Sequence, residues 1–304
     1  MSGQHHPNDR DLQAMRHVVK QRLRATYVEV GLARPMASTL AHLGRTNRGL
    51  IVYALGEIGG QGDTALLLAA STELMHRASV IIDDIEDGDT RRRGKPCLHV
   101  LVGERRALAI SDLLLSASLA RFQALGARYL NEAISAYADM AKGQAIDVGA
   151  VPLKGKRLDG PARLKTGSLI RMCFRLGALA AGLPEGEVTL YGNVGMHLGC
   201  VFQLQNDINN FSGTDLRYSN PRSDVEQGNI NSIVLAARLK GPLDETAFMH
   251  GLRKVEHTRQ THLTAAQEIL EREGLVIPDK LRRIMLDFAA GSRFVADQEG
   301  ILNN

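Results

Sequence analysis

The chain has 304 residues, 44% of them hydrophobic, and its 37 Lys and Arg residues outnumber its 33 Asp and Glu residues by four. A chain of this length and composition can bury a large core, which excludes a disordered protein and predicts a single domain over residues 1–304. The basic residues are scattered among the acids, and no basic run alternates with aromatic residues. We therefore expect no nucleic-acid binding.

The three cysteines, Cys97, Cys173 and Cys200, are odd in number and far apart in the sequence. This spacing is typical neither of a disulfide framework nor of a cysteine metal site, and it predicts a reduced, cytoplasmic protein. The first ten residues are polar, unlike a secretory signal, and no stretch reaches the roughly 18 apolar residues that span a bilayer. We therefore expect a soluble protein with no transmembrane segment.

Apolar residues recur at helical spacing along most of the chain, whereas alternating strand patterns are scarce. This periodicity predicts an all-α fold of about ten or more helices. One long helix is predicted to start near Asp63 and Thr64, which can act as caps, and to run into Asp87. Gly88 is a suitable terminator because glycine tolerates the left-handed conformation found at helix ends.

A second long helix is predicted after Pro184, with apolar residues on one side as far as Leu204. It should end near Gly213. The stretch 212–223 is rich in Gly, Ser, Asn and Pro, which indicates a loop directly beyond the polar end of this helix. Such a loop could close over a ligand.

The first predicted helix ends in an acidic motif, Asp83-Asp84-Ile85-Glu86-Asp87. The helical period puts Asp83 and Asp87 on one face, one turn apart, with Asp84 beside them. Clustered carboxylates repel one another unless they share a cation, and hard oxygen ligands suit Mg²⁺ bound together with substrate phosphates. Taken alone, however, such a motif is more often just the solvated end of a helix.

A basic run, Arg91-Arg92-Arg93-Gly94-Lys95, follows the acidic motif after a short loop. Carboxylates cannot bind phosphate, but a shared metal can, and arginine binds it directly through two parallel hydrogen bonds. Acids, metal and arginines together therefore indicate a site for a diphosphate. The alternative is a helix end closed by internal salt bridges.

Three further residues, Arg45, Arg48 and His76, could hold a second phosphate group. The two arginines lie three residues apart near a predicted helix start, and His76 lies two turns before Asp83 on the same helix. Taken singly, each is better explained as a solvated arginine or as a hydrogen-bonded core histidine.

Residues 73–94, with His76, the acidic motif and Arg92-Arg93-Gly94, resemble the first aspartate-rich region of trans-isoprenyl diphosphate synthases, the polyprenyl synthetase family. Within that family the resemblance is to geranylgeranyl diphosphate synthases. It covers roughly residues 40 to 235, through these further segments: 44–48, Gly143-Gln144, Lys165-Thr166 and Phe202-Gln203.

The resemblance implies a bundle of helices around a deep central apolar cavity, a homodimer, and Mg²⁺ ions shared with an allylic prenyl diphosphate. The implied metal ligands are Asp83, Asp84, Asp87 and Asp207. Arg92 and Lys165 would hold the allylic diphosphate, and four residues would hold the diphosphate of isopentenyl diphosphate: Arg45, Arg48, His76 and Arg93. Gln144 and Gln203 would lie near the reacting carbons.

The resemblance also places Ala78 and Ser79 at the floor of the cavity, one helical turn below the metal. Both side chains are small, so a product chain of about fifteen to twenty carbons should fit. Without the resemblance, the two residues could equally serve close helix packing.

The second aspartate-rich motif departs from the family pattern. Aspartates are expected at positions 206, 207 and 210, but the sequence reads Asn206-Asp207-Ile208-Asn209-Asn210. Asparagine offers an oxygen without a charge, so metal binding on this side should be weaker. A family lysine is also replaced by Asn229, and Arg217 or Arg222 could take its place.

Four functions remain open at this point. The first is condensation with isopentenyl diphosphate, and the second is prenyl transfer to a non-isoprenoid aromatic acceptor such as indole. The third, class I terpene cyclisation, is disfavoured because the chain has no Trp and only 4% aromatic residues to stabilise carbocations. The fourth, a non-catalytic partner subunit, is disfavoured by the complete first motif.

Overall fold

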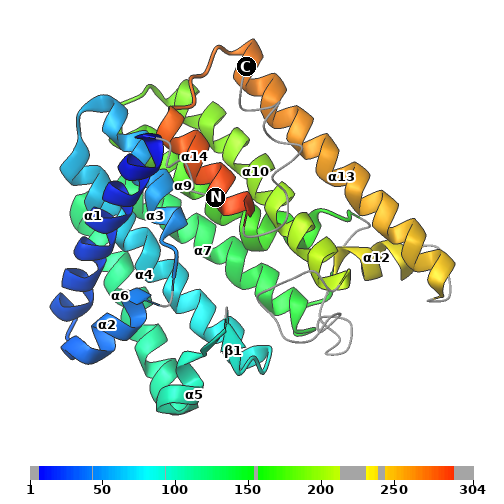
Figure 1. Cartoon of the computed structure of the whole chain (residues 1–304), viewed down its shortest axis with the longest axis horizontal. Helices are drawn as coiled ribbons and strands as arrows, with labels where there is room; N and C mark the ends of the chain where they lie inside the picture. Colours follow the sequence, from blue (N-terminus) through cyan, green and yellow to red (C-terminus); the bar gives the residue numbers. More distant parts are fainter. Residues whose placement is uncertain are drawn as a thin grey trace, which may run out of the picture.

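The computed structural model describes residues 7–42, 44–92, 94–153, 157–212, 231–238 and 244–290. Within these ranges the chain is built from helices, and the only strands are β1 (Arg91–Arg92) and β2 (Lys95–Pro96), which pair antiparallel as a short hairpin (Figure 1). The predicted all-α fold is confirmed.

The helices follow one another through short connections. In chain order they are α1 (Pro7–Glu29), α2 (Arg34–His42), α3 (Asn47–Gly56), η1 (Glu57–Gly59), α4 (Gly62–Glu86), α5 (Leu98–Val102), α6 (Glu104–Leu125), α7 (Ala127–Asp147), α8 (Gly160–Ala162), η2 (Arg163–Gly167), α9 (Ser168–Ala180), α10 (Glu185–Phe211), α12 (Ser232–Arg238), α13 (Glu245–Arg272) and α14 (Asp279–Ala290).

Helix α9 forms the centre of the bundle, and every one of its residues except Arg171 is buried. It packs against α10, α3 and α7, while α4 packs against α3 and α6 (Figure 1). The bundle buries a main core that joins α3, α4, α9 and the start of α10. A second core lies between α1, α4 and the start of α6.

The two long predicted helices are α4 and α10. Helix α4 begins at Gly62, and its N-cap, Gln61, makes no side-chain hydrogen bond, so Asp63 lies in the first turn instead of capping it. Gly88 follows the helix with φ +63°, the left-handed conformation expected of a terminator. Helix α10 begins directly after Pro184 and ends at Phe211, as its sequence pattern predicts.

The expectation that no segment is long and apolar enough to cross a membrane was wrong as a statement of composition. By length and composition alone, helices α4 and α6 are both long and apolar enough to cross a membrane. In α4, 67% of the most apolar 18-residue segment is buried inside the bundle, as in a core helix. In α6 the buried share of the corresponding segment is only 22%. Helix α6 therefore carries more apolar residues than its packing within one chain requires.

Candidate active site

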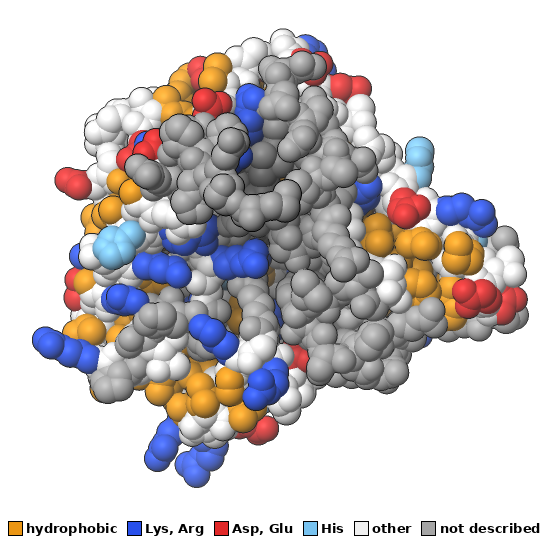
Figure 2. All heavy atoms as spheres, viewed as in Figure 1, with side chains coloured by type: hydrophobic (Ala, Val, Ile, Leu, Met, Phe, Trp, Pro, Cys, Tyr) orange, Lys and Arg blue, Asp and Glu red, His pale blue; other side chains and the backbone are white. Residues whose placement is uncertain are grey.

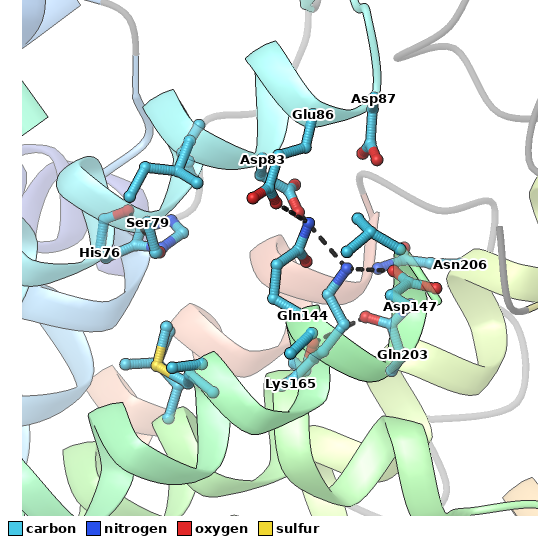
Figure 3. A pocket seen from close by; sticks show the side chains of 18 of the residues that line it. His76, Ser79, Asp83, Glu86, Asp87, Gln144, Asp147, Lys165, Gln203 and Asn206 are labelled. Carbon is cyan, nitrogen blue, oxygen red and sulfur yellow. Dashed lines mark hydrogen bonds and ion pairs between the residues drawn. The ribbon is translucent and has the colours of Figure 1, made fainter. Parts of the chain in front are cut away.

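A cavity of about 420 Å³ opens between the end of α4, α7, η2 and the end of α10 (Figure 3). Its volume falls within the usual range for small-molecule sites. Charged groups from α4, η2 and the hairpin occupy one part of the lining, and the apolar part includes Val80, Ile82, Met140, Ala141, Val148 and Leu169.

Arg92 closes the acidic end of α4. Its Nε lies 2.5 Å from Asp84 Oδ1 and its Nη2 lies 3.3 Å from Asp83 Oδ2, with Asp89 Oδ2 at 3.7 Å. Arg92 lies on strand β1 of the short β1–β2 hairpin, and this hairpin holds it next to the helix end. Burial opposes ionisation of Asp83, but Lys165 and Arg92 together lower the pKa of its carboxyl. Asp83 is thus an ion-paired carboxylate at the cavity, whereas Asp84, also predicted as a metal ligand, is buried against Arg92 and does not line the cavity.

Asp87 differs electrostatically from Asp83. Burial, followed by the negative charge of Asp83, raises the pKa of Asp87 to about 7. One turn of helix therefore holds an ionised carboxylate and a second one that binds a proton readily. Glu86, between them, accepts a hydrogen bond from Gln144 Nε2 at 2.6 Å, which links α4 to α7 across the cavity (Figure 3).

Lys165 joins three elements of the site. Its Nζ lies 2.5 Å from Asp147 Oδ2 on α7 and 3.3 Å from Asp83 Oδ1 on α4. Burial opposes its charge, but Asp83 and Asp147 raise the pKa of Lys165 well above the ordinary lysine value. Asp147 was missed by the sequence reasoning. Its position three residues after Gln144 put it next to that residue on the helix, which was the signal available.

Two glycines allow η2 to reach this position. A Cβ on Gly143 would lie 2.9 Å from Lys165 Cγ, and a Cβ on Gly199 would lie 2.7 Å from the Cα of Gly167. Helices α7 and α10 therefore contact η2 through bare backbone on both sides. The segment itself is π-helical, a geometry frequent at functional sites, and it carries Lys165 and Thr166 into the cavity wall.

Hydrogen bonds with the protein occupy the carboxylate of Asp207. Thr166 Oγ1 donates to Gln203 Oε1 at 2.7 Å, and Gln203 Nε2 donates to Asp207 Oδ1 at 2.9 Å. The other oxygen, Oδ2, accepts from Ser232 N at 3.1 Å and Ser232 Oγ at 2.5 Å. Asp207 lines the cavity but is only 4% exposed. The predicted metal ligand on α10 is thus a buried anchor for the start of α12.

The rest of the α10 wall is neutral. Asn206 and Asn210 both line the cavity. Their amide oxygens and nitrogens bring hydrogen-bonding capacity without charge, and the charged residues of the lining other than Asp207 come from the other elements around the cavity. Arg217, Arg222 and Asn229 lie outside the described residues, as does most of the predicted 212–223 loop.

The predicted second-phosphate set is only partly assembled. Arg48 and His76 line the cavity, whereas Arg45 is exposed and is not among the lining residues. Arg93 lies outside the described residues. Burial lowers the pKa of Arg48, and the charge of Glu73 opposes this shift. Glu73 is itself held by a hydrogen bond from the Gly49 amide at 2.8 Å, which fixes α3 against α4.

The two predicted floor residues lie in different places. Ser79 lines the cavity, and its hydroxyl donates to the carbonyl of His76 at 2.9 Å. Ala78 is fully buried against α6, where its carbonyl accepts from Ser111 Oγ at 2.9 Å, and it does not line the cavity. The sequence reasoning missed Tyr137, which lines the cavity from α7.

Among the described residues, no group of three His, Cys, Asp or Glu side chains is arranged to hold a metal ion by itself. The donor chemistry nevertheless fits Mg²⁺. This ion is usually bound by one or two carboxylates together with substrate phosphates, not by an all-protein cage. Asp83 and Asp87 would supply such carboxylates at the cavity, where both line the wall.

These features define an all-α isoprenoid synthase fold with a charged cavity mouth. The same fold occurs in a polyprenyl synthase from Caulobacter crescentus, whose structure is described as complexed with calcium and isoprenyl diphosphate. The two structures superpose with a TM-score of 0.72 over 94% of this chain and 95% of the other, at 20% identity. An identity this low supports the fold alone.

The sequence profile of the polyprenyl synthetases matches residues 29–270, and the chain belongs to this family, which makes it a prenyltransferase. The component 2 of heptaprenyl diphosphate synthase from Geobacillus stearothermophilus is 31% identical over 75% of this chain and 72% of its own. Geranylgeranyl diphosphate synthase from Sulfolobus acidocaldarius is 29% identical over 63% of this chain and 62% of its own, less than two thirds of that relative. The resemblance seen in the motifs is confirmed.

Proposed function

We propose that this protein condenses an allylic prenyl diphosphate in the C15–C20 range with isopentenyl diphosphate, in the manner of a geranylgeranyl diphosphate synthase and with Mg²⁺. The observation that carries this proposal is the contact of Lys165 Nζ with Asp83 at 3.3 Å and with Asp147 at 2.5 Å, beside Arg92 and at the edge of an apolar cavity. Such a site offers cations for a diphosphate and apolar walls for a prenyl chain.

The charged residues that line the cavity have different proposed roles. Arg92 and Lys165 would pair with the allylic diphosphate and stabilise the charge that builds up as pyrophosphate leaves. Mg²⁺, when bound by Asp83 and Asp87 together with phosphate oxygens, would neutralise the same leaving group. The apolar lining would keep water from the allylic cation, and the Gln144 and Gln203 amides would border the reacting carbons.

Two parts of the cavity lining favour different acceptors. Arg48 and His76 line the cavity and support the second diphosphate of isopentenyl diphosphate. In contrast, Asn206 and Asn210 are neutral and Asp207 is bonded to Ser232, so the α10 wall offers little negative charge to a metal. This wall favours a second candidate function, prenyl transfer to a neutral aromatic acceptor such as indole.

Product analysis separates these functions. Purified protein is incubated with Mg²⁺ and dimethylallyl, geranyl, farnesyl or geranylgeranyl diphosphate, each with isopentenyl diphosphate, with indole or with neither, and the products are identified by mass spectrometry. Elongated diphosphates that require isopentenyl diphosphate support the first function. Consumption of allylic substrate that is unaffected by isopentenyl diphosphate rejects it, and prenylated indole supports the second.

A matched pair of variants tests the site itself. Asp83→Asn/Asp84→Asn should abolish release of pyrophosphate, because the cavity loses the charge of Asp83 and Arg92 loses the carboxylate of Asp84 that positions it. Asp63 lies in the first turn of α4, at the end of the helix opposite to Asp83. Asp63→Asn should therefore retain full activity. Equal activity in both variants would reject the assigned site.

We also propose a homodimer formed through α6 and α7. Helix α6 exposes Leu108 and Leu113, 44% and 37% exposed, and α7 exposes Ile134 at 49%. Together with the low burial of the apolar α6 segment, this leaves exposed apolar side chains on two helices that pack against each other, and a second copy would cover them. Leu113→Glu/Ile134→Glu should give a monomer in light scattering, whereas an unchanged mass would reject this interface.

A further inference from the structure

A separate apolar patch lies on the short helix α5, beside the charged end of the cavity. Val100 and Leu101 are each 51% exposed, although Leu98 on the same helix is buried in the second core. Figure 2 shows hydrophobic side chains gathered at the lower end of the molecule, where Figure 1 places α5, with Lys and Arg side chains around them. Helix α5 is therefore held by one face and presents the other to solvent.

Basic residues flank these two apolar residues on both sides in the sequence. Arg91 and Lys95 of the hairpin and Arg105 and Arg106 of α6 are all exposed, whereas Glu104 is the only acid in the sequence from 91 to 108. Arg105 and Arg106 stand in the first turn of α6, where the helix dipole disfavours cations. The arrangement costs stability in the isolated protein, and an anionic partner would offset that cost.

We propose that this α5 patch, Val100 and Leu101 with Arg91, Lys95, Arg105 and Arg106, docks on the surface of an anionic lipid bilayer. Two apolar side chains can enter the interface between head groups and acyl chains, while the surrounding cations meet the anionic head groups. Insertion of the apolar side chains and attraction of the cations to the head groups together give reversible membrane binding, since either one alone is weak.

A bilayer fits the patch better than a protein partner does. A specific protein interface uses about 20 or more residues on each side, and this patch offers two exposed apolar side chains with a cationic border. The charge surplus selects an anionic surface over a zwitterionic one. No interleaved aromatic residues are present on α5 to stack with nucleic-acid bases.

Docking through α5 would orient the catalytic cavity. The hairpin that carries Arg91 and Lys95 also carries Arg92, which bonds Asp83 and Asp84 at the cavity. A bilayer bound at α5 would therefore lie next to the charged end of the cavity and not at the opposite end of the bundle. This inference concerns a surface outside the cavity, so it can be tested without turnover and stands apart from the choice of acceptor.

The test is co-sedimentation of the full-length protein with vesicles of phosphatidylcholine alone or mixed in equal parts with phosphatidylglycerol. We expect binding to the anionic vesicles only, weakening as salt rises from about 0.1 M because screening shortens the reach of the charges. Arg105→Gln/Arg106→Gln should weaken the partition constant about twenty-fivefold, from roughly a fivefold effect for each cation. Val100→Ser/Leu101→Ser should weaken it at least about tenfold.

Two matched controls keep the result specific. Arg253→Gln/Lys254→Gln removes two exposed cations from α13, and Ile58→Ser/Val276→Ser removes two exposed apolar side chains elsewhere; both should bind vesicles like the unmodified protein. Soluble-substrate activity should be unchanged in the α5 variants, which shows that they are folded. Absence of binding to anionic vesicles, equal binding to both vesicle types, or equal losses in the controls would overturn the proposal. A change of oligomeric state in Val100→Ser/Leu101→Ser would instead identify the patch as a contact between copies and would also overturn it.

Discussion

The carboxylate of Asp207 accepts hydrogen bonds from both the backbone amide and the hydroxyl of Ser232, at 3.1 and 2.5 Å. Asn231 adds a third contact by donating to the Asp207 carbonyl at 3.1 Å. These bonds connect the end of α10 to the start of α12, on either side of residues 213–230. The one acid retained in the second motif thus ties two helices together at the cavity wall.

Replacing Asp207 should affect the stability of the protein more than its metal binding. We expect Asp207→Ala to lower the free energy of unfolding by about 1 to 3 kcal/mol, because buried donors on Gln203 and Ser232 lose their acceptor. Urea denaturation measures the stability change, and calorimetric titration with Mg²⁺ and pyrophosphate measures metal binding. A loss of metal affinity as large as that of Asp83→Asn, in a protein of unchanged stability, would contradict this assignment.

Lys165, which contacts both Asp83 and Asp147, is expected to be needed for turnover. Lys165→Met should lower kcat/KM by about a hundredfold to a thousandfold, the usual loss when one preorganised group that stabilises developing charge is removed. Asp147→Asn should have a smaller effect in the same direction, because the lysine keeps Asp83 but loses its partner at 2.5 Å. Steady-state kinetics shows which of the two variants loses more kcat/KM. A larger loss in Asp147→Asn than in Lys165→Met would show that Asp147 has a role of its own.

Backbone contact between α10 and η2 makes Gly199 intolerant of a side chain. A Cβ there would lie 2.7 Å from Gly167 Cα and 2.9 Å from the Thr166 carbonyl oxygen, and neither backbone atom can turn away. Gly199→Ala should destabilise by about 1 to 3 kcal/mol and shift η2 enough to reduce activity. Gly186→Ala, in open space on the same helix, should be neutral or slightly stabilising. Thermal unfolding of the two variants compares them directly.

The different positions of Ser79 and Ala78 predict different outcomes for the same enlargement. Ser79→Leu fills part of the cavity lining and should shorten the prenyl product. Ala78→Leu should instead overpack the contact with α6 and cost about 1 to 3 kcal/mol of stability without changing the product length. Product chain lengths and melting temperatures of both variants provide the measurement. Shorter products from a stable Ala78→Leu protein would show that Ala78 also limits the chain.

A partly buried histidine pair gives the stability of the protein a pH dependence. His197 Nδ1 lies 2.9 Å from His262 Nδ1, and His262 Nε2 lies 3.3 Å from Asp159 Oδ2. Burial, followed by the charge of His262, lowers the pKa of His197 from 6.5 to about 4. Because the unfolded chain then binds a proton more readily than the folded one, this contribution is complete above about pH 6.5 and is lost as the pH falls toward 4.

The size of this effect is modest because His197 is only partly buried. After allowance for solvent screening we expect about 1 kcal/mol between pH 7 and pH 4. His197→Gln should flatten this part of the stability profile, measured by denaturant unfolding at a series of pH values. His257→Gln, an exposed histidine on α13, should leave the profile as it is. Identical profiles for the unmodified protein and His197→Gln would contradict the assignment.

Local patterns in the sequence were enough to predict the helical class, the long helices α4 and α10, and the acidic motif with Arg92 nearby. Each of these depends on residues close together in the chain: a helical period, a terminating glycine, or carboxylates one turn apart. The motifs also sufficed to identify the polyprenyl synthetase family, because residue types at fixed spacing carry that information without a structure.

Only the tertiary structure decided which of these side chains meet. Asp147 bonds Lys165, Asp207 bonds Ser232, and Ala78 turns to α6 while Ser79 reaches the cavity. All four outcomes depend on how distant helices pack, and close approaches such as Gly199 against Gly167 set that packing. Spacing along one helix determines which face a residue occupies, but not which neighbour that face will contact.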